Sequence, residues 1–317
     1  MIVVVLQGKM DSKQRAIKSK DLEDAMRNIV ILIENAEKAQ EDVTEFLEEL
    51  MKLNILKSLI FHLHYFTKEG KQDVRGLWLK SIRNRKARKT LWTHIRENPE
   101  ILILLVRGAS VKCYDSGEIF RACLTNSLAV HYLVLNSPLV WQYFKFVAQE
   151  DFELSSDAFK SFKTIVSRRK ADKEKRGITK FLKDNFDKFF KNFCDLLMSD
   201  VFHVKLQALK LLSEILQKRE NFSVMVKFIS YPSHLHLMID NLCADDSREK
   251  GMKFQAFHVF KFFVANPKKG KTILNVLRAR RTEILKTLIE MKRTEEQSEI
   301  EYGRELPLLI DRIRELE

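Results

Sequence analysis

A ten-residue pattern occurs three times in this chain of 317 residues, without a gap in any copy. Each copy has Asp or Gln, then Ala, an apolar residue, Lys or His, any residue, an apolar residue, two residues of any kind and two apolar residues. The copies begin at Asp157, Gln207 and Gln255, so that their alanines lie 50 and 48 residues apart. A period of this length, with only helical sequence between the copies, is typical of armadillo or HEAT repeats, which stack helices into a solenoid.

The third copy lies in residues 252–267, MKFQAFHVFKFFVANP, a segment that is apolar on nearly two faces. At 100° per residue its apolar arc spans roughly 160°, whereas a surface helix shows a stripe about 100° wide or somewhat more. Phe254 and Phe262 lie outside that arc, beside His258 and Lys261. The segment is too short and too charged to span a membrane. We therefore expect an inner helix with neighbours on both sides, and we interpret His258 as a packed residue.

Turn-forming residues are scarce, which excludes most sheet-containing folds. Nine glycines and five prolines are too few for the turns of a β-sandwich or for the strand-to-helix loops of an α/β enzyme. With the repeat, this predicts an all-α armadillo/HEAT-like solenoid, a right-handed superhelical rod. We expect residues 20–317 to form one such domain and residues 1–19 to be a disordered or weakly ordered extension.

Hydrophobic periodicity places the helices of this solenoid. The predicted helices span residues 20–37, 41–53, 54–66, 73–83, 116–126, 127–136, 138–149, 178–198, 221–230, 233–243, 271–291 and roughly 294–315. Residues 67–70 are predicted to form a turn and residues 83–89, RNRKARK, a basic linker. Pro99 fits the first turn of a helix that ends near Gly108. Pro267 should end the helix before it, and Pro307 should kink or break the last one.

Residues that could support catalysis or hold a metal do not form any known pattern. His62 and His64 are two apart, as are His234 and His236, and on a helix such pairs point to different faces. The chain has no GxGxxG, GxSxG or HExxH motif, and its four cysteines form no CxxC pair. Scattered cysteines are typical of core thiols in a reducing compartment. We expect no enzymatic activity, no metal and no cofactor, and a scaffold that binds through an extended surface.

The net charge of +13 is distributed unevenly along the chain. Residues 20–50 contain 3 basic and 10 acidic side chains, and residues 290–317 contain 5 and 9. Residues 1–19 carry +3, which leaves +21 on residues 51–289. The positive electrostatic field of such a segment attracts anionic partners, and an abundant solvated basic surface without a specific partner remains an alternative.

No stretch reaches 18 apolar residues, and the apolar opening MIVVVLQG is too short for a signal peptide. We therefore expect a cytoplasmic protein without a membrane span.

Two binding hypotheses follow from charge and repeats alone. A basic helical solenoid could bind nucleic acid or acidic peptides without catalysis, although the chain lacks the aromatic platforms and repeat-code residues of modules that read sequence. An armadillo adaptor for extended peptides would carry a ladder of inner-helix Asn and Trp residues. Trp78, Trp92 and Trp141 do not follow the repeat period, so the sequence argues against this adaptor.

Longer runs of the sequence carry a family resemblance. They are DFELSSDAFKSFKTIVSRR (151–169), KLLSEIL (210–216), RENF (219–222), FIS (228–230) and, most specifically, FQAFHVFKFFVANP (254–267). The run EGKQDV (69–74) extends the set upstream, so that it covers most of the chain. These runs resemble the mouse protein twenty-five family, also called calcium-binding protein thirty-nine.

The resemblance implies a rod of armadillo-like repeats without enzymatic activity. It implies a scaffold that allosterically activates a protein kinase or pseudokinase of the sterile-twenty/germinal-centre type, with a second kinase in a ternary complex. The chain alone would be monomeric, nucleic acid is not an expected partner, and fungal relatives serve cell polarity. Despite the family's name, the sequence has no EF-hand ligand pattern.

The resemblance also implies two binding surfaces. A concave kinase-binding face would use Phe202, Lys210, Arg219 and Phe222, with Phe202 where the family usually has Tyr. For Phe222 the alternative is a residue that staples the following short helix. For Arg219 the alternative is one more solvated base.

The second implied surface is a pocket that receives a Trp-Glu-Phe motif from a pseudokinase tail. It would use Leu206, Ile239 and Ala279, which stand where the family has Arg, Met and Lys. Arg278 and Arg280 flank Ala279 and could substitute for that Lys. The Arg missing at position 206 would pair with the acidic residue of the motif. Its loss removes a charge-assisted hydrogen bond of about 1.5–3 kcal/mol. The sequence therefore also allows a tail with a different middle residue.

Overall fold

The computed structural model describes residues 12–108, 114–167, 172–244, 250–295 and 305–316, and these residues form helices and no strand. In chain order the helices are α2 (Ser12–Lys38), α3 (Thr44–Lys52), α4 (Ile55–Phe61), η1 (Leu63–Tyr65), α5 (Lys68–Arg83), α6 (Ala87–Glu97), α7 (Glu100–Gly108), α8 (Tyr114–Asn126), α9 (Leu128–Leu135), α10 (Leu139–Val147), α11 (Phe152–Val166), α12 (Asp172–Asp184), α13 (Phe186–Leu197), α14 (Phe202–Gln217), η2 (Arg219–Asn221), α15 (Phe222–Phe228), α16 (Pro232–Leu242), α17 (Lys250–Ala265), α18 (Lys271–Ala279), α19 (Arg281–Glu295) and α20 (Glu305–Arg314). The all-α prediction is confirmed. None of these helices is long and apolar enough to cross a membrane.

Backbone contacts divide the chain into two compact units. The first comprises Met1–Val147 and Asp151–Arg168, and the second comprises Ala148–Glu150 and Arg169–Glu317. The prediction that residues 20–317 form a single domain stays a prediction. Residues 1–11 lie outside the described residues, whereas α2 already begins at Ser12, inside the segment that we expected to be weakly ordered.

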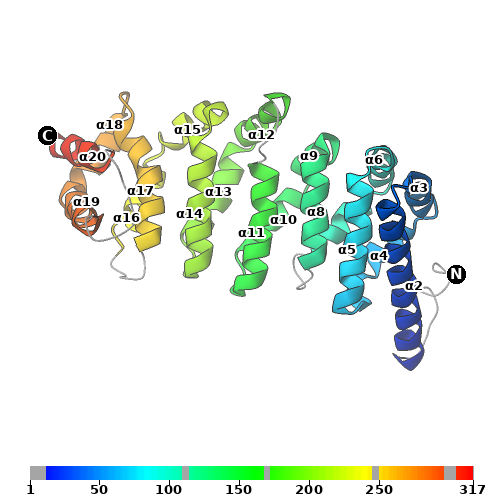
Figure 1. Cartoon of the computed structure of the whole chain (residues 1–317). Helices are drawn as coiled ribbons and strands as arrows, with labels where there is room; N and C mark the ends of the chain where they lie inside the picture. Colours follow the sequence, from blue (N-terminus) through cyan, green and yellow to red (C-terminus); the bar gives the residue numbers. More distant parts are fainter. Residues whose placement is uncertain (1–11, 109–113, 168–171, 245–249, 296–304, 317) are drawn as a thin grey trace. The chain divides into compact units, whose positions relative to one another are not determined.

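Each unit repeats every three helices. In the first unit α5 packs on α8 and α8 on α11, α3 on α6 and α6 on α9, and α4 on α7. Figure 1 shows α5, α8 and α11 side by side. In the second unit α14 packs on α17 and α17 on α20, α13 on α16 and α16 on α19, and α12 on α15. Stacking of every third helix is the armadillo-like arrangement of a helical-repeat solenoid.

The repeated pattern of the sequence marks the third helix of a triplet. Ala158, Ala208 and Ala256 lie in α11, α14 and α17, and each is fully buried. Most of the segment 252–267, which is apolar on nearly two faces, lies in α17. This helix packs on α14, α16 and α20. Its His258 ring lies 4.4 Å from the Phe254 ring, edge to face, and burial lowers the pKa of His258. The prediction of an inner helix is confirmed.

Polar contacts between successive triplets join residues about one repeat apart. Lys80 binds Glu37 at 2.6 Å, 43 residues away, and Lys261 binds Glu305 at 2.6 Å, 44 residues away. Because these pairs bridge neighbouring copies of the same helix, they follow the period of the repeat. Their sequence separation is slightly shorter than the 48 to 50 residues between the repeat alanines.

Three predicted boundaries are wrong. Residues 67–70 do not form a turn, because the Thr67 hydroxyl accepts a hydrogen bond from the Gly70 N–H at 3.1 Å and caps a helix that begins at Lys68. The basic linker is shorter than predicted, since α6 already begins at Ala87. The last predicted helix is described only from Glu305, so Pro307 lies in the first turn of α20, where a missing N–H leaves no intrahelical bond unmade, and α20 continues past it.

The predicted helix 54–66 forms α4 and the short 3₁₀ helix η1, and two other predicted helices are each divided into two α-helices. The segment 178–198 separates at Asn185, whose side chain donates a hydrogen bond to the Phe181 carbonyl at 3.0 Å and so ends α12. The segment 271–291 separates at Arg280, whose side chain is bound to Asp240 and Glu283. Periodicity alone runs through both breaks, because the apolar positions continue on either side.

Two glycines in neighbouring inner helices provide a test of this packing. A methyl group on Gly117 of α8 would overlap Asp157 Oδ2 of α11, whose carboxylate is held by Arg121 at 2.9 Å. We expect Gly117→Ala to lower the free energy of unfolding by about 1–3 kcal/mol, because this buried pair must shift. Gly76 in α5 has open space around it, so Gly76→Ala should raise the free energy by about 0.5–1 kcal/mol. Urea denaturation measures both, and two changes of the same sign would contradict the packing.

Candidate partner-binding surface

One face of α14 carries three of the candidate residues from the sequence. Phe202, Leu206 and Lys210 are spaced by four residues, which places them on one side of the helix. Phe202 is 44% exposed, Lys210 is exposed and Leu206 is half-buried. The structure thus brings together residues that the sequence analysis assigned to two different surfaces.

The chain turns directly after α14 and presents two further candidates. Arg219 begins the short helix η2 and Phe222 begins α15. Arg219 is exposed, and Phe222 is 63% exposed although Val224 and Phe228 of the same helix are buried. A phenylalanine that serves only as a staple would be expected to pack, so its exposure favours the interpretation as a contact residue.

A buried asparagine holds this turn in place. Asn221 lies between the two candidates and is 1% exposed. Its side chain donates to the Ile215 carbonyl at 2.9 Å and accepts from the Thr179 hydroxyl at 2.8 Å, which ties η2 to α14 and α12. The role of Asn221 in positioning this turn was not predicted from the sequence. The available signal was a short polar residue inside the RENF run, but its burial could not be inferred from periodicity.

Aromatic packing fixes the far end of α15. The Phe228 ring lies 5.1 Å from the Phe190 ring, 6.1 Å from the Phe263 ring and 4.2 Å from the His234 ring. His234 Nδ1 also lies 2.8 Å from the Phe228 carbonyl oxygen. Burial lowers the pKa of His234, and the hydrogen bond to that carbonyl opposes the shift. The short helix that carries Phe222 is therefore held by α13, α16 and α17.

The candidates for the tail pocket lie on three different helices. Leu206 is on α14, Ile239 is fully buried in α16, and Arg278 and Ala279 are exposed at the end of α18. Helix α14 packs on α17, whereas α18 packs on α16. Because Ile239 is covered by its own unit, a peptide could contact it only after a local rearrangement.

The two arginines that flank Ala279 differ in their contacts. Arg280 donates to Glu283 at 2.7 and 2.8 Å and also pairs with Asp240. This guanidinium lowers the pKa of Glu283 by hydrogen bonding to its carboxylate. Arg278 is exposed and has no ion pair within the described part of the chain. Of the two, Arg278 is the one able to meet an acidic residue of a partner without breaking an existing pair.

Within the described residues, no group of three or more His, Cys, Asp or Glu side chains is placed to hold a metal ion. Cys123, Cys194 and Cys243 are free thiols, and burial raises the pKa of Cys123 to about 12. Cys113 lies outside the described residues. A buried, protonated thiol is a poor nucleophile, so Cys123 is a core residue.

Comparison with known proteins gives consistent matches along the chain. A family model described as Mo25-like matches residues 3–317. The human protein "Calcium-binding protein 39-like" is 31% identical over 322 residues, which cover 100% of this chain and 91% of that protein. "MO25-like protein 2" of Caenorhabditis elegans is 32% identical over 283 residues, covering 87% and 80%. The "Mo25-like protein" of Schizosaccharomyces pombe is 30% identical over 277 residues, covering 86% and 81%.

Proposed function

Because this chain belongs to the Mo25-like family, we propose that it is a non-catalytic scaffold that binds and activates a protein kinase or pseudokinase of the sterile-twenty/germinal-centre type. The family is one of scaffold-type proteins. One observation carries the kinase contact: Arg219 and Phe222 are exposed beside each other on a turn that Asn221 holds rigid. We also propose that the protein acts in the cytoplasm and that a second kinase joins it in a ternary complex.

The proposed contact is of the kind that dominates protein interfaces. Aromatic residues and arginines carry a disproportionate share of binding energy, and they do so best when they are preorganised. Phe222 offers apolar area, Arg219 offers a planar set of donors for a carboxylate or phosphate, and Phe202 and Lys210 extend the surface along α14. This combination supports a protein partner with both an apolar patch and acidic groups.

Activation requires more than binding. A scaffold shifts a kinase toward its active arrangement only by the difference in its affinity for the active and inactive states. Each tenfold preference for the active state corresponds to about 1.4 kcal/mol. A rigid surface suits this role, because a surface that adapted to both kinase states would bind them equally and shift nothing.

Phosphotransfer by a kinase domain in the presence of this protein tests the proposal. A germinal-centre-type kinase domain from the same organism is mixed with the full chain at micromolar concentration, and both complex formation and activity are measured. We expect a complex and a stimulated rate. If neither a complex nor a stimulated rate is found, the proposal is refuted. A complex without a stimulated rate would refute activation alone.

We also propose that the tail-binding surface is altered by the residue at position 206. Leu206 is half-buried on the exposed face of α14, where an arginine can extend toward solvent. We expect Leu206→Arg to tighten binding of a Trp-Glu-Phe tail peptide by about 10- to 100-fold, because it restores a charge-assisted hydrogen bond. Fluorescence anisotropy measures the affinity, with Leu206→Met as the uncharged control. Equal affinities for all three proteins would contradict this assignment.

A further inference from the structure

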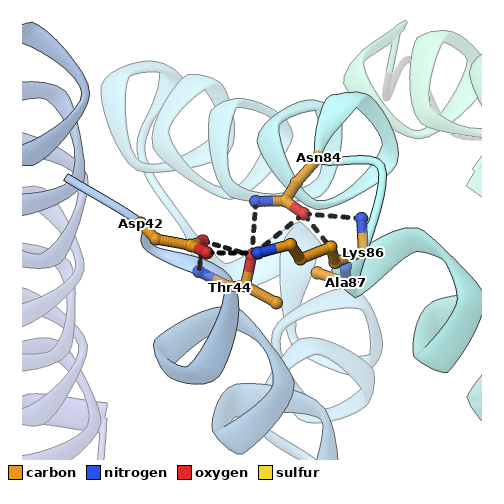
Figure 2. Close-up of polar contacts among 5 residues, drawn as sticks. All are labelled: Asp42, Thr44, Asn84, Lys86 and Ala87. Atoms are coloured by element: carbon orange, nitrogen blue, oxygen red, sulfur yellow. Dashed lines mark hydrogen bonds and ion pairs between the residues drawn. The ribbon is translucent and has the colours of Figure 1, made fainter. Parts of the chain in front are cut away.

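The turn between α5 and α6 is fastened to the start of α3 (Figure 2). Asn84 Nδ2 donates to Thr44 Oγ1 at 3.2 Å, and Asn84 Oδ1 accepts from the backbone N–H groups of Lys86 and Ala87, both at 3.0 Å. Lys86 Nζ donates to Asp42 at 2.7 Å, and Asp42 also accepts from the Thr44 N–H at 3.0 Å. This network crosses from one triplet to the next and holds the backbone that carries the basic run.

An open depression lies beside this turn, in the first unit. It has a volume of about 760 Å³ and is lined by Glu48 of α3 together with Arg85, Lys86, Arg88, Lys89 and Thr90. Glu48 accepts a hydrogen bond from the Thr90 hydroxyl at 2.7 Å, which joins α3 to α6 at the depression that both residues line. Four of the six lining residues are basic, although α3 itself is rich in glutamates.

Three of these basic residues have no acidic partner among the described residues. Lys86 is engaged by Asp42 at 2.7 Å, and hydrogen bonding to Lys86 lowers the pKa of that carboxyl. Arg85 and Lys89 are exposed and Arg88 is half-buried, and none of the three forms an ion pair there. Basic side chains that line one depression without acidic partners, on a backbone held by hydrogen bonds, are an unsatisfied site for an anion.

The surroundings of the depression restrict the kind of anion. Glu48 of α3 lines the depression itself, and Asp42, just before α3, is bound to Lys86, so two carboxylates lie among the basic residues. An extended polyanion such as nucleic acid would run across these carboxylates and be repelled by them. A single dianionic group could sit among Arg85, Arg88 and Lys89 alone. The open depression is also much larger than a phosphate group, so it has room for flanking peptide residues.

We propose that this depression binds a phosphorylated side chain of a partner protein, with Arg85, Arg88 and Lys89 contacting the phosphate. The site lies in the first unit, whereas the residues of the proposed kinase contact lie in the second. It therefore adds a second, phosphorylation-dependent contact and does not rest on kinase activation. Arginine is suited to this role, because its planar donors match two oxygens of a phosphate at once.

Fluorescence anisotropy with the full chain tests the proposal at an ionic strength of about 0.15 M. The probes are a short labelled peptide with one phosphoserine among neutral residues, the same peptide with serine, and a short labelled single-stranded DNA. Inorganic phosphate is the competitor. We expect the phosphopeptide to bind at least about tenfold more tightly than the serine peptide.

Matched variants separate the site from the general positive charge. Arg85→Gln with Arg88→Gln should weaken phosphopeptide binding by at least about tenfold, because two charge-assisted contacts are lost. Arg96→Gln with Arg293→Gln removes the same charge from exposed positions elsewhere and should change binding by less than about twofold. Lys89→Gln alone should give an intermediate loss. Kinase stimulation by the Arg85/Arg88 variant should equal that of the original chain, which keeps this test distinct from the proposed function.

Several results would overturn the proposal. Equal binding of the two peptides would show that phosphate is not recognised, and equal losses in the two double variants would assign binding to diffuse charge. DNA that binds more tightly than the phosphopeptide and is weakened by the Arg85/Arg88 variant would identify a polyanion surface. Inorganic phosphate that binds as tightly as the phosphopeptide would identify a site for the free anion.

Discussion

Replacing Arg219 and Phe222 with alanine together is expected to abolish stimulation of the partner kinase at micromolar concentrations. Both side chains are exposed on the turn held by Asn221, so their removal should cost contact energy and leave the fold intact. Interface residues of this kind contribute about 2 kcal/mol or more each, so losing both should weaken binding by about 1,000-fold or more. The phosphotransfer assay and a direct binding titration measure the two effects separately.

A matched control uses the same residue classes on the other unit. Tyr132 of α9 is 63% exposed, as is Phe222, and Arg96 of α6 is exposed. Tyr132→Ala with Arg96→Ala should leave kinase stimulation unchanged. If the control variant loses stimulation as well, the effect does not belong to the turn after α14. If the Arg219/Phe222 variant keeps full stimulation, the proposed contact is wrong.

Replacing Phe263 with alanine should give the largest loss of stability among single substitutions considered for this protein. Phe263 lies in α17, is fully buried and meets the Phe228 ring edge to face at 6.1 Å. Removing a buried phenylalanine lowers the free energy of unfolding by about 3–5 kcal/mol, through lost burial and the cavity left behind. That is a large fraction of the 5–15 kcal/mol typical of a folded domain.

Urea denaturation of Phe263→Ala and Phe222→Ala compares a buried and an exposed phenylalanine of the same unit. We expect Phe222→Ala to change the free energy of unfolding by no more than about 0.5 kcal/mol, as is usual for exposed positions. A loss for Phe263→Ala no larger than that for Phe222→Ala would mean that α17 is not an inner helix. The same pair of variants shows whether loss of kinase stimulation in the Phe222 variant is separable from loss of stability.

Local sequence signals predicted much of the helical structure. Helix α17 ends before Pro267 and α7 ends at Gly108, as predicted, and Pro232 lies at the first position of α16. These signals act within one or two turns of helix, which is why they can be read without knowing the fold. The predictions failed where a side-chain contact ended or extended a helix, as at Asn185, Thr67 and Arg280.

Exposure of the candidate residues could not be predicted from periodicity or resemblance. Phe222 and Ile239 are both apolar residues on short helices, yet Phe222 is 63% exposed and Ile239 is fully buried. Their difference depends on which neighbouring helices cover each position. The same is true of Asn221, whose two buried hydrogen bonds reach to residues 6 and 42 positions away.

The sequence by itself determined the helical class, the repeat and the identity of the inner helices, because apolar periodicity and the scarcity of turn residues act locally along the chain. The tertiary structure decided which of the candidate side chains are exposed and which are buried. The turn that presents Arg219 and Phe222 and the depression lined by Arg85, Arg88 and Lys89 both depend on contacts between successive triplets. Such contacts join residues 40 to 44 positions apart, beyond the reach of any local pattern.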